Sequence, residues 1–252
     1  MSPSGRTVLV TGAAGFIGSH LVERLLARGD AVVGIDNFDP FYSPAEKRAN
    51  LAAALANPRF TLIEADCAEL ETVEAALAGR DIDVLVHLAA KAGVRPSLEQ
   101  PMAYARANVM ATQAMLELAR RRGIRRFIFG SSSSVYGNNE KVPFAEDDPV
   151  ERPISPYAAT KRAGELLCHT YHHLYGMGVI ALRFLRSTDR GSAPTWRSAG
   201  SPRSCCAVSR SPCSAMARPS ATTPGSTTSC RASLPRSTGP LSGPVSTTSS
   251  TW

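Results

Sequence analysis

The sequence predicts a doubly wound α/β fold, in which a parallel sheet carries helices on both of its faces. Two observations predict this class. Short and almost continuously apolar runs alternate with helical patterns up to about residue 185, as expected for strands that are buried on both faces. A glycine-rich turn also follows the first apolar run directly and opens a helical pattern.

Six apolar runs are the predicted strands, and they lie at Thr7–Val10, Ala31–Ile35, Phe60–Ile63, Val84–Leu88, Arg126–Phe129 and Val179–Arg183. Helical patterns fill the connections between them, at residues 16–28, 44–55, 70–79, 101–122 and 156–175. A sheet of this kind binds ligands at the carboxyl ends of its strands. We therefore look for functional residues at those ends and on the helices that follow.

The turn after the first strand reads Thr-Gly-Ala-Ala-Gly-Phe-Ile-Gly over residues 11–18. Gly12 and Gly15 allow a sharp turn and a close approach to a pyrophosphate, which a Cβ atom would obstruct. Phe16 and Ile17 begin the helix, whose free N–H groups and dipole favour negative charge, and Gly18 lets the helix pack close to the strand. The flanking strand and helix indicate a Rossmann-type dinucleotide site rather than an ordinary turn.

An acidic residue, Asp36, ends the second apolar run and is followed by Asn37. A carboxylate about 20 residues after the glycines suits the ribose 2′-hydroxyl of NAD and repels the 2′-phosphate of NADP. We therefore expect NAD as the cofactor.

Tyr157 and Lys161 are four residues apart in a predicted helix, so they share one face. A free tyrosine has a pKa of about 10, too high for a base at neutral pH. A nearby ammonium and an oxidised nicotinamide ring would favour the phenolate. The pair is a candidate catalytic base with its activator, although a surface Tyr and Lys would show the same spacing.

Four consecutive serines, at residues 131–134, follow the fifth predicted strand. Their small hydroxyls can bond a substrate hydroxyl and the tyrosine without crowding a sugar ring. A serine-rich loop without function is the alternative.

Together these residues resemble the extended short-chain dehydrogenases/reductases, and within them the nucleotide-sugar epimerases and dehydratases. The resemblance covers residues 6 to about 185. It implies that Ser132, which lies 25 residues before Tyr157, is the catalytic hydroxyl and that Tyr157 and Lys161 also contact the cofactor. It adds further cofactor-site residues, namely Asp66, Cys67, Leu88, Ala89, Ala90 and Asn108.

The residues after Ser132 bear on the subclass. The 4,6-dehydratases carry an acid or acid pair there, because elimination of water needs a general acid and base. Ser133 and Ser134 cannot do that work, which favours 4-epimerisation. Segments 34–39 and 92–99 look most like UDP-glucuronate 4-epimerases. Arg95 could bind a substrate carboxylate or phosphate, or form a loop salt bridge, and Ser132 and Ser133 are the other predicted substrate contacts.

The implied reaction is redox-neutral: C4 of a UDP-sugar is oxidised while the hydride passes to NAD, and the hydride then returns to the other face of the 4-keto sugar. A 4,6-dehydratase, another sugar epimerase and a non-catalytic NAD-binding remnant remain as alternatives. The resemblance also implies a homodimer that pairs helices 101–122 and 156–175.

The composition changes abruptly after residue 185. Residues 186–252 contain 17 serines and eight arginines against one acid, which accounts for the whole net charge of +7. The charge is therefore no sign of nucleic-acid binding. Shifted by one base, GC-rich codons for residues 187–198 would read V-Y-G-P-R-Q-R-P-D-L-A-I. We therefore predict a frameshift near Leu185, with an NAD-binding domain over 1–185 and a disordered, low-complexity tail over 186–252 in place of a substrate lobe.

Other features predict little chemistry. The apolar runs are too short for a membrane span, and the short polar N-terminus shows no signal peptide, so we expect a cytoplasmic protein. His169 and His173 lie one helical turn apart but lack a third ligand, and the six cysteines lack a zinc spacing, so we expect no metal site.

Overall fold

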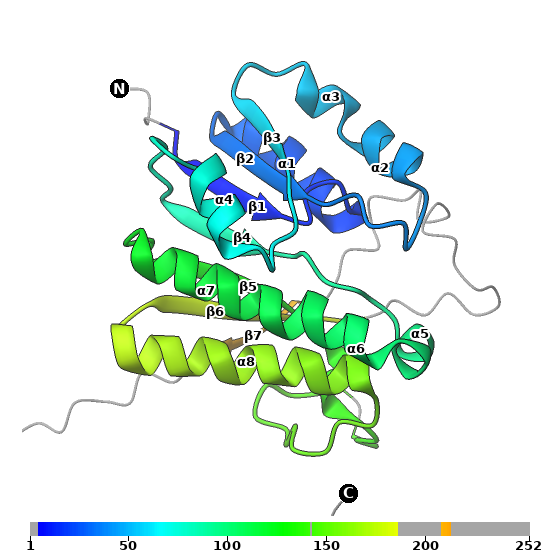
Figure 1. The fold of residues 1–252 in the computed structure, drawn as a ribbon. Helices are drawn as coiled ribbons and strands as arrows, with labels where there is room; N and C mark the ends of the chain where they lie inside the picture. Colours follow the sequence, from blue (N-terminus) through cyan, green and yellow to red (C-terminus); the bar gives the residue numbers. More distant parts are fainter. Residues whose placement is uncertain (1–4, 142, 186–207, 213–252) are drawn as a thin grey trace, which may run out of the picture. The chain divides into compact units, whose positions relative to one another are not determined.

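The computed structural model describes residues 5–141, 143–185 and 208–212. One seven-stranded sheet with the order β3-β2-β1-β4-β5-β6-β7 forms its centre (Figure 1). The strands are β1 (Thr7–Thr11), β2 (Ala31–Asp36), β3 (Phe60–Glu64), β4 (Val84–His87), β5 (Arg126–Ser132), β6 (Gly178–Phe184) and β7 (Val208–Pro212). The α-helices are α1 (Phe16–Arg28), α2 (Pro44–Asn50), α3 (Ala52–Leu55), α4 (Leu70–Ala76), α5 (Val94–Glu99), α6 (Pro101–Tyr104), α7 (Ala111–Arg121) and α8 (Pro156–Tyr175).

The first six strands are parallel, and the strand order reverses beside β1. Thr11 at the end of β1 pairs with Ile35 of β2 on one side and with His87 of β4 on the other. The chain thus leaves β1 toward β3, returns to β4 and continues outward to β6. This confirms the predicted doubly wound sheet and places its switch point between the carboxyl ends of β1 and β4.

Two hydrophobic clusters cover the two faces of the sheet. Val8 and Val10 point toward α1 and α3, whereas Leu9 between them points toward α4, α7 and α8, as the alternation of a strand requires. Figure 1 shows α7 and α8 side by side along that second face. Because both faces of the central strands β1 and β4 are covered, their inner positions are mostly apolar, which is why the sequence pattern predicts them well.

Two predicted helices are interrupted. Residues 44–55 divide into α2 and α3 at the fully buried Leu51. Residues 101–122 contain a π-helical stretch, Ala105–Met110, between α6 and α7. Such widened turns are common at functional sites, and this one contains Asn108.

One described segment of the predicted tail, Val208–Pro212, forms β7 and pairs with β6 in the antiparallel sense. The sequence analysis did not anticipate this strand. Without β7, β6 would be the edge strand of the sheet and would present unpaired N–H and C=O groups. Such groups can pair with an extended segment of almost any composition. All other residues of the predicted tail lie outside the described part of the chain.

Candidate functional site

The glycine turn between β1 and α1 has the backbone geometry that requires glycine. Gly12 has a φ of 68°, and a Cβ on it would lie 2.8 Å from the backbone nitrogen of Ala89. A Cβ on Gly18 would overlap the Gly12 carbonyl oxygen. Gly15 immediately precedes α1 and donates its N–H to that same carbonyl at 3.1 Å. The glycines therefore let this turn pack directly against the Ala89 backbone and the start of α1, whose first turn contains Phe16 and Ile17.

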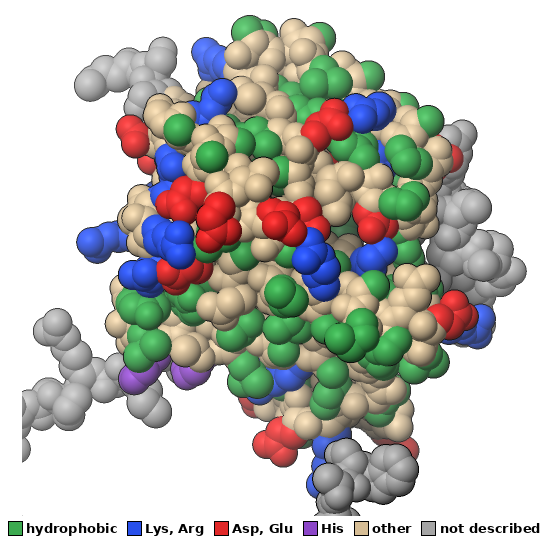
Figure 2. Space-filling view, in the orientation of Figure 1, with side chains coloured by type: hydrophobic (Ala, Val, Ile, Leu, Met, Phe, Trp, Pro, Cys, Tyr) green, Lys and Arg blue, Asp and Glu red, His purple; other side chains and the backbone are tan. Residues whose placement is uncertain are grey.

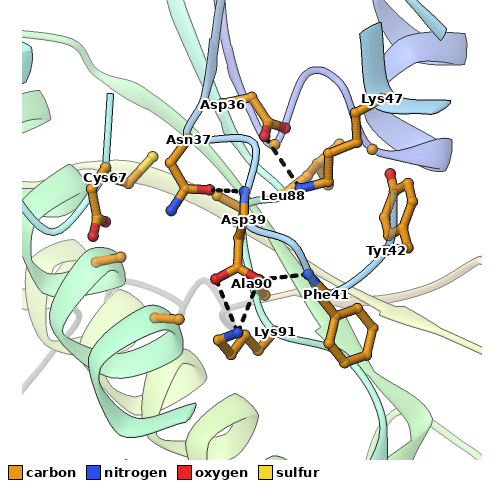
Figure 3. A pocket seen from close by; sticks show the side chains of 16 residues that line it. Asp36, Asn37, Asp39, Phe41, Tyr42, Lys47, Cys67, Leu88, Ala90 and Lys91 are labelled. Atoms are coloured by element: carbon orange, nitrogen blue, oxygen red, sulfur yellow. Dashed lines mark hydrogen bonds and ion pairs between the residues drawn. The ribbon is translucent and has the colours of Figure 1, made fainter. Parts of the chain in front are cut away.

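A cavity lies at the carboxyl ends of β1, β2 and β4, beside this turn (Figure 3). Nine of the predicted cofactor-site residues line it: Gly12, Gly15, Asp36, Asn37, Asp66, Cys67, Leu88, Ala89 and Ala90. Seven lining residues were not predicted: Asp39, Phe41, Tyr42, Lys47, Lys91, Ala107 and Ala111. Four of this second group lie in the segment after β2, Lys91 lies in the loop after β4, and Ala107 and Ala111 lie in the π-helical stretch and at the start of α7.

Asp36 is the buried carboxylate of the cavity. It accepts the N–H groups of Ala14 at 3.1 Å and Phe38 at 2.8 Å, and Lys47 Nζ lies 3.4 Å from its Oδ1 atom (Figure 3). These contacts leave acceptor capacity on Oδ2, the oxygen that Ala14 also contacts. A ribose hydroxyl could use it, which fits the predicted role.

The segment that follows β2 forms hydrogen bonds with the glycine turn. Tyr42 Oη and Asn50 Nδ2 both donate to the Ala14 carbonyl oxygen, at 3.3 and 3.1 Å. Burial and the nearby Asp36 carboxylate raise the pKa of Tyr42 to about 12, so its hydroxyl stays a donor. Tyr42, Lys47 and Asn50 were not predicted, because residues of α2 and of the loop before it carry no spacing signature that links them to Ala14 or Asp36.

A second unpredicted cation lies at the other side of the cavity. Lys91 Nζ pairs with Asp39 at 3.0 Å, and Asp39 also accepts the Phe41 N–H at 2.9 Å (Figure 3). The half-buried ammonium is thus balanced by a carboxylate within the lining of the cavity.

The three predicted catalytic side chains come from β5 and α8. Ser132 is the last residue of β5, and Tyr157 and Lys161 lie on the first two turns of α8. Ser155 starts that helix by accepting the Ala158 N–H at 3.1 Å with its side chain, and Pro156 follows at the first helical position. Capping therefore determines where the helix begins, and so where Tyr157 lies.

The electrostatics around Tyr157 differ from the expectation. Burial raises the pKa of the Tyr157 phenol, and a hydrogen bond with Ser132 lowers it in part. Burial also lowers the pKa of Lys161 to about 8, and its Nζ donates to the Gly130 carbonyl at 2.7 Å. The expected activation of the phenol by the ammonium is absent, because Lys161 is not among the groups that shift the pKa of Tyr157 and its ammonium is directed to the Gly130 carbonyl.

A buried ion pair, which sequence analysis missed, holds β5, β6 and α8 together. Arg183 donates to Glu165 through Nε at 2.9 Å and Nη2 at 3.0 Å, and through Nη1 to the Tyr136 hydroxyl at 3.0 Å. Ser131, next to Ser132, donates to Glu165 at 2.6 Å. Glu165 is one turn after Lys161, so this pair determines the position of the catalytic helix relative to the end of β5.

The structure places the remaining predicted residues outside the cavity lining. Asn108 is buried in the π-helical stretch, where its amide bonds both backbone groups of Lys91 at 2.8 and 3.1 Å. Ser133 is half-buried at the start of a short 3₁₀ turn. Arg95 is exposed on α5.

The residues present fit a dinucleotide. Gly12 and Gly15 line the cavity without side chains, the start of α1 offers N–H groups to a pyrophosphate, and Asp36 can accept from a ribose. In the described part of the chain, no group of three or more His, Cys, Asp or Glu side chains could hold a metal ion. None of the helices described is long and apolar enough to span a membrane.

Comparison with known proteins identifies a family. Residues 9–193 match the protein family described as GDP-mannose 4,6 dehydratase. UDP-glucuronate 4-epimerase 4 of Arabidopsis thaliana is 43% identical over 182 residues, which are 72% of this chain and 41% of that protein. An uncharacterized protein of Methanocaldococcus jannaschii is 47% identical over 183 residues, 71% of this chain and 56% of that one.

Two solved structures are similar in fold. The UDP-glucuronic acid 4-epimerase of Bacillus cereus in complex with UDP-glucuronic acid and NAD is 40% identical, with a TM-score of 0.64 over 70% of this chain and 55% of that one. A dTDP-glucose 4,6-dehydratase of Streptomyces venezuelae with NAD bound is 35% identical, with a TM-score of 0.62, and the match covers 68% of this chain and 53% of that one. The chain thus spans about half the length of the relatives that it matches.

Proposed function

Because the chain belongs to the NAD-dependent epimerase/dehydratases among the extended short-chain dehydrogenases/reductases, we propose that residues 5–185 bind NAD and carry the chemistry of a UDP-sugar 4-epimerase, with UDP-glucuronate as the substrate. The observation that carries the proposal is the arrangement at one end of the sheet. Tyr157 and Lys161 lie in the first two turns of α8, Ser132 at the end of β5 hydrogen-bonds Tyr157, and the glycine turn lines the cavity at the switch point.

Each predicted site residue has a separate role in the proposed reaction. Gly12 and Gly15 leave room for the pyrophosphate, and Asp36 accepts from the adenosine ribose. Bound NAD supplies a hydride acceptor that can return the hydride, so the sugar is oxidised and reduced at C4 without net redox change. Tyr157 takes the proton of the sugar 4-hydroxyl and later returns it, while Ser132 bonds the same hydroxyl.

Lys161 has two functions in this mechanism. Its ammonium, which donates to the Gly130 carbonyl in this structure, would hold the nicotinamide ribose of bound NAD, and its positive charge would stabilise the Tyr157 phenolate. The Lys161 pKa of about 8 keeps the group largely protonated at neutral pH.

The residues after Ser132 favour epimerisation over dehydration. Ser133 and Ser134 stand where a dehydratase needs an acid, and the Ser134 hydroxyl accepts from Ser132 at 3.2 Å. Relatives of both kinds resemble the chain, so a 4,6-dehydratase is the second candidate. We assign Arg95 to the substrate carboxylate or phosphate only through its place in segment 92–99.

We further propose that the protein forms a homodimer through the helices of residues 101–122 and 156–175. Large apolar side chains are exposed on them, with Met102 80%, Met110 56%, Leu166 52% and Leu174 60% accessible. Hydrophobic side chains gather over α6, α7 and α8 in Figure 2. A patch of this kind is more typical of an interface than of a monomer surface.

We also propose that residues 186–252 are read out of frame and replace a lobe that binds the nucleotide sugar. The chain spans about half of its relatives, and the shifted codons yield a V-Y-G-P turn after β6. Resequencing codons 180–190 tests this. A missing or extra base would restore a longer protein, whereas an unchanged read would refute a sequencing error and leave a gene whose product turns over little substrate.

The experiment for the function itself uses the 252-residue chain and the frame-restored protein side by side. Each is incubated with NAD and UDP-glucuronate, and the appearance of the C4 epimer is followed by chromatography. We expect epimer formation by the restored protein and its loss in Tyr157→Phe, with Tyr175→Phe on the exposed end of α8 as the matched control. A 4-keto-6-deoxy product from dTDP-glucose would favour the dehydratase, and NAD binding without either product would leave only a binding module.

A further inference from the structure

His87 at the end of β4 is fully buried, and the mechanism above does not use it. Both ring nitrogens have a hydroxyl partner. Nδ1 lies 2.8 Å from Thr11 Oγ1, at the end of β1, and Nε2 lies 3.1 Å from Thr112 Oγ1 on α7. The ring therefore joins two elements that bound the cofactor cavity.

The partners of the two threonines determine the direction of each hydrogen bond. Thr112 Oγ1 lies 2.6 Å from the carbonyl oxygen of Asn108, which can only accept, so the Thr112 hydroxyl proton points there. Nε2 of His87 must then carry a proton and donate to Thr112. At the other end, Thr11 Oγ1 accepts the N–H groups of Leu88 and Ala89, both at 3.2 Å, and its own proton points to Nδ1.

Two neighbouring groups could disturb this assignment, and neither does. The Cys67 thiol also contacts Thr11, but burial and the nearby acids raise the pKa of Cys67 to about 12, and a neutral sulfur is a weaker acceptor than an imidazole nitrogen. Burial and the positive charge of Lys161 lower the pKa of His87 to about 3. The doubly protonated ring is therefore excluded at neutral pH, and one neutral tautomer satisfies every bond.

The chain of hydrogen bonds continues to the catalytic helix. The Asn108 side chain donates to Thr160 Oγ1 at 3.0 Å, and Thr160 donates to the Tyr157 carbonyl at 2.8 Å. The same amide holds the backbone of Lys91. Two chains of hydrogen bonds thus meet at Asn108: one runs from the loop after β4 through His87 and Thr112 to its backbone carbonyl, and the other runs from its side chain to the first turn of α8.

We propose that His87, as its neutral Nε2–H tautomer, is a positioning residue that couples the cofactor loops at Thr11 and Ala89 to the helix of Tyr157. The coupling to catalysis rests on the function proposed above, whereas the tautomer and the mechanical coupling do not. Both can be measured on the 252-residue chain without substrate.

The first measurement is the ¹⁵N spectrum of the histidine rings in the uniformly labelled chain, with His87 identified by its loss in His87→Gln. We expect an unprotonated Nδ1 and a protonated Nε2 that do not change between pH 6 and pH 8. A protonated Nδ1, or titration of the ring in this range, would overturn the proposal.

The second measurement breaks the network at one end and observes the other. Thr112→Val removes the acceptor of Nε2 and the donor to Asn108 while keeping the side-chain shape. We expect the amides of Leu88 and Ala89 to exchange with solvent about tenfold faster and NAD to bind about tenfold more weakly, the effect of one buried hydrogen-bond partner.

The matched control is Thr170→Val, which removes the same kind of hydrogen bond, from a threonine to the carbonyl four residues earlier, on the exposed side of α8. It should change neither quantity. Unchanged exchange at Leu88 and Ala89 in Thr112→Val would refute the coupling. If the parent chain bound no NAD, the proposed function would fail while the exchange result still decided the role of His87.

Discussion

Replacing Arg183 with methionine tests whether the buried ion pair holds the catalytic helix in place. Arg183 and Glu165 are 4% and 7% exposed, and two hydrogen bonds join the guanidinium to the carboxylate. Arg183→Met keeps the length of the side chain but leaves the Glu165 carboxylate buried without its main partner. Ser131 and Arg162, at 2.6 and 3.0 Å, remain to solvate it in part.

Breaking a buried pair by removing one partner typically costs about 3–5 kcal/mol. Because two donors to Glu165 remain, we expect the free energy of unfolding to fall by about 3 kcal/mol, the lower end of that range. For a domain of this size, this corresponds to a fall in melting temperature of about 6–12 °C. The double variant Glu165→Leu/Arg183→Met removes both charges and should recover most of the loss, since an apolar pair needs no solvation.

The assay is urea unfolding followed by circular dichroism, repeated from pH 7 to pH 3. Burial raises the pKa of Glu165, but bonds from Arg183 and Ser131 lower it more, so its net pKa is below the usual value. The stabilisation is therefore present above the unfolded pKa of about 4.3 and is lost as the pH falls through the folded pKa. A loss below about 1 kcal/mol at pH 7, or a double variant no better than Arg183→Met, would refute the reasoning.

Three further predictions concern the cofactor site and the catalytic lysine. Gly12→Ala forces a side chain onto a φ of 68° and against the Ala89 backbone, so calorimetry should detect no NAD binding, while far-UV circular dichroism stays unchanged. Asp36→Ala should weaken NAD binding by about tenfold, because the acceptor for the ribose hydroxyl is lost, and should reduce the ratio of NAD to NADP affinity, because the charge that repels the 2′-phosphate is lost too. An equal loss of affinity for NAD and NADP would contradict this. Burial lowers the pKa of Lys161 to about 8 in the folded protein. Between pH 8 and pH 10 the unfolded chain therefore binds more protons at this lysine than the folded chain does, so the free energy of unfolding of the parent should rise with pH relative to that of Lys161→Met. If the urea midpoints of the two proteins changed in parallel over this range, the buried Lys161 would make no pH-dependent contribution and the prediction would be wrong.

Local chemistry explains why much of this site could be predicted. The glycines at 12, 15 and 18 and the carboxylate at 36 act through backbone room and position along the chain, and these are visible in the residue order. The same holds for Tyr157 and Lys161, whose helix begins at the capping Ser155. The central strands were predictable because both faces of the sheet are covered there and their inner positions are mostly apolar.

Groups that act across the fold could not be predicted. Lys47 meets Asp36 only because α2 folds back over the end of β2, and Arg183 meets Glu165 only because β6 lies beside β5. A charged residue looks the same in a sequence whether it is solvated or buried beside its partner. The pKa of Tyr157 shows the same limit: spacing indicated an ammonium nearby, but only the packing revealed that burial raises this pKa and that Lys161 does not shift it.

The amino-acid order by itself thus determined the class of the fold, the cofactor turn and the identity of the candidate base, because each depends on local backbone geometry or periodic burial. Tertiary structure alone decided the partners of Asp36, the ion pair behind the catalytic helix and the tautomer of His87. The physical reason is that a hydrogen bond or ion pair depends on distance and desolvation, and both arise only when segments far apart in the chain pack together.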